Sequence, residues 1–154
     1  MDNNTIAANI FRTLNIVFLG MTMGQVIMFA LFFNLRQNNL GLHLPFQYVA
    51  LAAVVGAILG APWLYSRLLT SYQNGANLPF GNKMRAYFSA NLVKLAVLEA
   101  AALSCLVFLF LTGQLYYAYL FLAVFFAFLL HRPKPVKCAE DLQLNDEERM
   151  YLPR

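Results

Sequence analysis

Four long apolar blocks constrain the fold of this chain more than any other feature. They cover residues 14–33, 48–65, 92–111 and 115–130. Each has roughly 16 to 20 residues, close to the length that an α-helix needs to cross about 30 Å of hydrocarbon. The blocks lack the alternation of transmembrane barrel strands and are too long for them. They therefore predict membrane-spanning helices.

The composition agrees with this prediction. With 60% hydrophobic and 12% charged residues, a soluble domain of 154 residues would leave too much apolar surface in water. We predict an all-α polytopic membrane protein. Its four transmembrane helices, at about 14–33, 48–66, 88–112 and 115–131, form one bundle domain over residues 1–132. The first block contains Asn15 and Gln25 and lacks a cleavage site, so it is read as a retained helix.

Basic residues near the helix ends predict the orientation. One basic residue, Arg12, precedes the first helix, and three each lie in the second connection and after the fourth helix, at Arg67, Lys83 and Arg85 and at Arg132, Lys134 and Lys137. The first connection has only Arg36, and the third has none. Both termini are therefore predicted to be cytoplasmic, with residues 133–154 as a tail. Topology and anionic lipid headgroups account for the net charge of +4, and no nucleic-acid motif is present.

Small residues indicate where helices could pack. Gly20 and Gly24 form a small-xxx-small pair on the first predicted helix, and Gly56 and Gly60 form another on the second. Such faces let helix backbones approach closely in lipid. The phenylalanines between residues 121 and 128 are instead predicted to face lipid or a partner.

Glu99 is the strongest functional candidate. It is a lone carboxylate midway along the third apolar block, where an ionisable group costs several kcal/mol unless it is neutralised, paired or hydrated. Gln25 falls at a similar depth, and Thr22 lies one turn before it. We predict a midplane polar cluster of these three residues. It would be a structural hydrogen bond, a proton- or cation-handling group, or a contact with a partner subunit.

Lys94 and Asn91 form a second polar feature, near the inner end of the third helix. Lys94 and Glu99 are about 140° apart around the helix, so they are not expected to pair. Lys94 would either extend its ammonium outward to the membrane surface or pair with a group on another helix. Asn91 would share this inner polar edge.

The sequence gives no support to catalysis of the kind found in soluble enzymes, and no cofactor or metal is predicted. Cys105 lies inside the third helix and Cys138 in the tail, so no disulfide is expected between them. His43 has no second ligand at metal-binding spacing. In the tail, Asn145 followed by Glu148 has the spacing of a capped short helix.

Residues 96–103, Ala-Val-Leu-Glu-Ala-Ala-Ala-Leu, follow an alanine- and glycine-rich helix and a polar loop. This arrangement resembles the hairpin of rotary-ATPase proteolipid subunits, which implies that Glu99 carries a proton or a sodium ion. The resemblance covers the second and third helices only. The loop is longer than in that family and lacks its Arg-Gln-Pro-like turn, and the two remaining helices have no counterpart in a two-helix proteolipid.

A second set of motifs spans most of the chain: Gly24-Gln25, Lys83-Met-Arg-Ala-Tyr87, Leu98-Glu99, Leu111-Thr-Gly-Gln114 and Arg132-Pro-Lys-Pro135. It resembles a family of uncharacterised bacterial four-helix membrane proteins, which implies the bacterial inner membrane but no established activity.

Three functions follow as hypotheses. The first is a non-enzymatic subunit or accessory partner of a larger membrane assembly or self-oligomer, because the glycine faces are smooth and catalytic groups are absent. The second is a proton- or cation-translocating oligomer in which Glu99 titrates. The third is a lipid or quinone binder that holds a head group with Gln25, Glu99 and Lys94.

Overall fold

The computed structural model describes residues 2–35, 45–73 and 78–153, and these segments are helical with no strand among them. The all-α prediction is confirmed. The helices are α1 (Asn3–Leu35), α2 (Pro45–Gln73), α3 (Phe80–Thr112), α4 (Leu115–Leu130), α5 (Pro135–Asp141) and α6 (Asp146–Arg149). The predicted first connection, with Arg36 and His43, lies outside the described residues.

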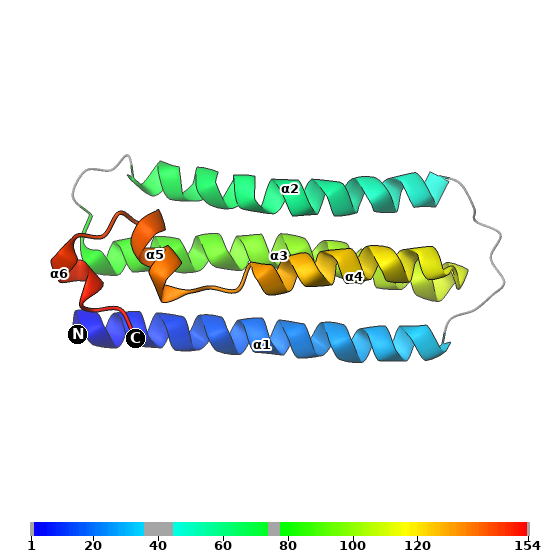
Figure 1. Ribbon diagram of the computed structural model, residues 1–154, viewed down its shortest axis with the longest axis horizontal. Helices are drawn as coiled ribbons and strands as arrows, with labels where there is room; N and C mark the ends of the chain where they lie inside the picture. The colour runs from blue at the N-terminus through cyan, green and yellow to red at the C-terminus, as the bar shows by residue number, and fades with distance from the viewer. Residues whose placement is uncertain (1, 36–44, 74–77, 154) are drawn as a thin grey trace.

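Helix α3 is the centre of the molecule (Figure 1). It packs along α1, α2 and α4, whereas α1 and α2 lie on opposite flanks and share little contact. One stripe of α3 remains uncovered, with Val93, Ala96, Ala100, Ser104 and Val107 exposed at helical spacing. The four long helices therefore leave an open face on their central member.

Three helices are long and apolar enough to cross a membrane, namely α1, the segment Gln47–Thr70 of α2, and α3. Helices α4 and α5 together would make a fourth such segment, bent by 78° between them. These lengths indicate a membrane protein. Helices α1 and α3 have 33 residues each, which is about 50 Å and exceeds the hydrocarbon thickness. Both begin earlier than the apolar blocks, so polar turns extend them beyond the apolar region.

Aromatic residues of α4 pack inward against α1. Phe128 stacks on Phe18 with 5.1 Å between ring centroids, and Phe121 stacks on Phe29 at 5.0 Å. Phe121 and Phe128 are both buried, whereas Phe126 is exposed. The prediction that the phenylalanines of this helix face outward is therefore wrong for Phe121 and Phe128, because α1 offers matching rings along its length.

The tail docks on the end of the bundle where α1 and α3 begin (Figure 1). Cys138, Leu142 and Leu144 are buried in one cluster with residues from the first turns of α1, α3 and the end of α2. Lys83 forms an ion pair with Glu148 at 2.7 Å. Glu148 also completes the predicted capping box with Asn145, whose side chain accepts from the Glu148 amide at 2.7 Å. The tail is thus part of the fold.

The opposite end is closed by a tight connection between α3 and α4. Gly113 adopts a left-handed conformation, with φ of 68°, and its amide donates to the Leu109 carbonyl. A residue without a Cβ suits this position. Beside it, the Gln47 amide of α2 donates to the Gln114 side chain at 3.0 Å. This contact joins α2 to the connection.

Candidate functional site

Glu99 lies midway along α3 and is partly exposed on the outer surface of the bundle. No hydrogen bond or ion pair joins it to any other described residue. A carboxyl group at this depth without a partner leaves its hydrogen-bonding capacity unused in an apolar region. Glu99 is therefore available to a group from outside the described chain.

Gln25 points the other way, into the bundle. Its side chain is fully buried, and neither its Oε1 nor its Nε2 has a hydrogen-bond partner among the described residues. The predicted hydrogen bond between Gln25 and Glu99 is not formed. Thr22 does not join them either, because its hydroxyl donates to the Phe18 carbonyl of the preceding turn at 2.8 Å. The predicted midplane cluster is not formed, because residues at the same depth in a bundle can point in different directions.

The glycine pairs do not pack helices together within the described chain. A Cβ added at Gly20, Gly24, Gly56 or Gly60 would meet no atom within 4 Å. The prediction that these glycines mediate packing is wrong for contacts inside this bundle. Close approach to α3 is made by alanines instead, such as Ala57 and Ala61 of α2, which are buried in the main core. The glycine faces are left open.

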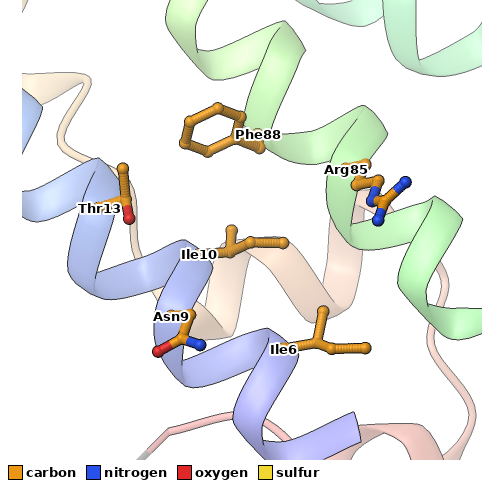
Figure 2. Close-up of a pocket in the computed structure, with 6 residues that line it drawn as sticks. All are labelled: Ile6, Asn9, Ile10, Thr13, Arg85 and Phe88. Atoms are coloured by element: carbon orange, nitrogen blue, oxygen red, sulfur yellow. The ribbon is translucent and has the colours of Figure 1, made fainter. Parts of the chain in front are cut away.

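A pocket of about 260 Å³ lies between the first turns of α1 and α3, lined by Ile6, Asn9, Ile10, Thr13, Arg85 and Phe88 (Figure 2). Gly20 and Gly24 follow Ile6 and Ile10 by two heptads on α1, and Glu99 follows Arg85 by two heptads on α3. Because two heptads are nearly four full turns, these residues share faces with the cavity lining. The open glycines and the unpartnered carboxylate thus lie on the same sides of α1 and α3 as this pocket, and we call the strip of surface from the pocket to Gly24 and Glu99 the α1–α3 groove.

Lys94 and Asn91 lie on a different face of α3. Lys94 is only 3% exposed, and its Nζ lies 4.3 Å from the centroid of the Tyr65 ring on α2. Of the two alternatives predicted for Lys94, the contact with another helix is the one formed, as a cation–π contact, and the buried ammonium does not extend outward. Asn91 is also buried, and its Nδ2 donates to the Tyr87 carbonyl at 2.9 Å while its Oδ1 has no partner among the described residues. The predicted inner polar edge of Lys94 and Asn91 is therefore buried inside the protein.

Gln25, Glu99 and Lys94 therefore face three directions. Gln25 is in the core, Glu99 is on the outer surface, and Lys94 is under the tail. The prediction that these three residues hold one head group is not supported by this geometry.

A second cavity, which the sequence did not reveal, lies under the start of the tail. It has a volume of about 210 Å³, and its lining includes Asn91, Lys94, Arg132, Lys134 and Lys137. The tail lysines and Arg132 predicted only the orientation, because nothing in their spacing shows that the tail folds back over Lys94. Among the residues outside the two undescribed connections, no three His, Cys, Asp or Glu side chains gather to hold a metal ion.

No family model matches this chain, and neither the curated proteins nor the solved structures contain a significant match.

Proposed function

We propose that this chain is a non-enzymatic subunit of the bacterial inner membrane, in which α1, α2, α3 and α4 cross the bilayer. Its α1–α3 groove receives a transmembrane helix from another chain, with Glu99 as the polar contact. The assembly is either a hetero-complex or a self-oligomer.

Charge placement supports the proposed orientation. The two ends of the described chain lie at the same end of the bundle (Figure 1). Arg12, Lys83 and Arg85 lie in the first turns of α1 and α3, which begin at that end, and the basic residues of the tail are there too. Basic residues are retained on the cytoplasmic side of membrane proteins. Both termini are therefore proposed to be cytoplasmic.

The observation that carries the assembly proposal is Glu99 itself. Its side chain is partly exposed at mid-depth on α3 and has no partner among the described residues. Leaving a carboxyl group in contact with lipid is costly, and a polar group on an approaching helix would relieve that cost. Gly24 on the facing wall of the groove has no atom near the place of a Cβ, so a second backbone could come close.

The test is native mass spectrometry of the protein purified in mild detergent. We expect co-purifying subunits, or more than one copy of this chain, in the wild type. Glu99→Gln should weaken the assembly, and Gly24→Leu should abolish it by filling the groove. Gly60→Leu is the matched control, because Gly60 is an equally open, half-buried glycine on the opposite flank.

A wild type that is always monomeric and without partners would refute the proposal. Equal loss of the assembly in Gly24→Leu and Gly60→Leu would also refute it, because the α1–α3 groove would then not be the binding surface. An oligomer that survives Glu99→Gln but loses proton flux in liposomes would instead support the alternative, a translocating oligomer in which Glu99 titrates.

A further inference from the structure

The cavity under the tail gathers positive charge around a small polar space. Lys94 and Asn91 of α3 form its buried part, and the exposed side chains of Arg132, Lys134 and Lys137 surround it. No acidic residue of the described chain lines it. Asp141 is not part of this lining, but its charge attracts the Lys94 ammonium, and its Oδ2 accepts a hydrogen bond from the Tyr65 hydroxyl at 2.5 Å. The cavity is thus built of cations without an anion in its walls.

Such a gathering is costly in the absence of an anion. Lys94 is held among apolar and aromatic side chains, with the Tyr65 ring against its ammonium. Lys94 and Lys137 line the same small space, so their like charges repel one another, and this repulsion exceeds the attraction of Asp141 for Lys94. A bound anion would stabilise the buried Lys94 ammonium and offset its repulsion from Lys137, because it would attract both ammonium groups and accept their hydrogen bonds.

The cavity also has an apolar edge. Leu130, the last residue of α4, lines it and is 83% exposed. It ends a 16-residue helix with no charged residue, which crosses the apolar part of the proposed bilayer. The cavity therefore opens where the acyl chains of a lipid would meet its head group.

We propose that this cavity binds the phosphate of an anionic phospholipid from the cytoplasmic leaflet. Lys94 contacts the phosphate from below, and Lys134, Lys137 and Arg132 contact it from the tail side. The acyl chains lie along Leu130. Basic pockets at this depth between helices are a known way to recognise lipid head groups. The inference requires the proposed orientation but does not depend on the α1–α3 groove.

Native mass spectrometry in micelles can test this by titrating phosphatidylglycerol against phosphatidylcholine with the same acyl chains. We expect phosphatidylglycerol to bind preferentially. Lys94→Gln and Lys137→Gln should each weaken its binding about tenfold, which corresponds to about 1.4 kcal/mol. Arg12→Gln is the matched control, because Arg12 is an exposed basic residue near the same membrane surface but away from the cavity. Lys137 is exposed, so its variant remains informative if Lys94→Gln fails to fold.

Equal binding of the two lipids, or equal weakening by Arg12→Gln and Lys137→Gln, would overturn the proposal. Binding of inorganic phosphate would be measured in the same way. If it binds in a Lys137-dependent way while phosphatidylglycerol shows no preference, the cavity is a site for a free anion and the lipid assignment is wrong. None of these outcomes depends on Glu99, so failure here is distinguishable from failure of the assembly proposal.

Discussion

At the scale of single residues, several buried polar side-chain atoms have no hydrogen-bond partner among the described residues. Gln25 is the clearest case, with a fully buried amide and no hydrogen bond to the described residues. A buried polar group without a partner costs about 1–3 kcal/mol. Such a residue limits the stability of the bundle.

Replacing Gln25 by methionine, which has nearly the same shape, should therefore raise the free energy of unfolding by about 1 kcal/mol. Denaturation by SDS in mixed micelles, followed by the fluorescence of the single tryptophan, Trp63, would measure it. Gln25→Asn keeps the amide and leaves a void, so it should destabilise. A loss of stability in Gln25→Met would show that the amide has a partner, such as an internal water.

At the scale of elements, the short helix α5 has one buried side chain, Cys138. Burial, and then the nearby charge of Asp141, raise the pKa of the Cys138 thiol from 9.0 to about 12. Since the docked state favours the neutral thiol, its contribution is fully present below pH 9 and is lost as the pH rises toward 12. Docking of the tail should thus weaken only in alkaline solution.

Maleimide labelling in a Cys105→Ala background checks this docking. At pH 8, Cys138 should react at least about a hundredfold more slowly than an exposed cysteine, because its thiolate is scarce and covered. The control is Val136→Cys with Cys138→Ser, since Val136 is 72% exposed on the same helix. Similar rates at the two positions would mean that α5 is not docked in solution.

At the scale of the whole molecule, both ends of the described chain lie at the same end of the bundle, which the proposed orientation makes cytoplasmic. We expect a C-terminal green fluorescent protein to fluoresce and a C-terminal alkaline phosphatase to be inactive, because phosphatase activity requires export. Phosphatase inserted after Asn38, in the first connection, should be active. The reverse pattern for the two C-terminal fusions would contradict the orientation.

The sequence predicted where the helices lie in the chain better than which side of each helix is buried. Blocks of apolar residues indicate helices directly, and the Asn145–Glu148 spacing identified a real cap. The inward positions of Phe121 and Phe128 and the open positions of Gly20 and Gly24 could not be predicted in the same way. Apolar and small side chains suit both lipid and a neighbouring helix, so composition does not say which surface they meet.

The candidate sites show the same limit. Glu99 was identifiable because a carboxylate is rare at that depth, but its lack of an internal partner depends on where Gln25 points. The cavity around Lys94 requires the tail to fold back over α3, and that return is set by contacts such as Lys83 with Glu148. Those residues are 65 positions apart in the chain.

The central position of α3 has a consequence for biosynthesis. Helices α1 and α2 emerge from the ribosome first, yet they share little contact and meet mainly through α3. In the proposed topology they therefore enter the bilayer as separate, unpacked helices. Their packing then waits for α3, so a pause in translation just before Phe80 would prolong the time for which α1 and α2 remain unpacked.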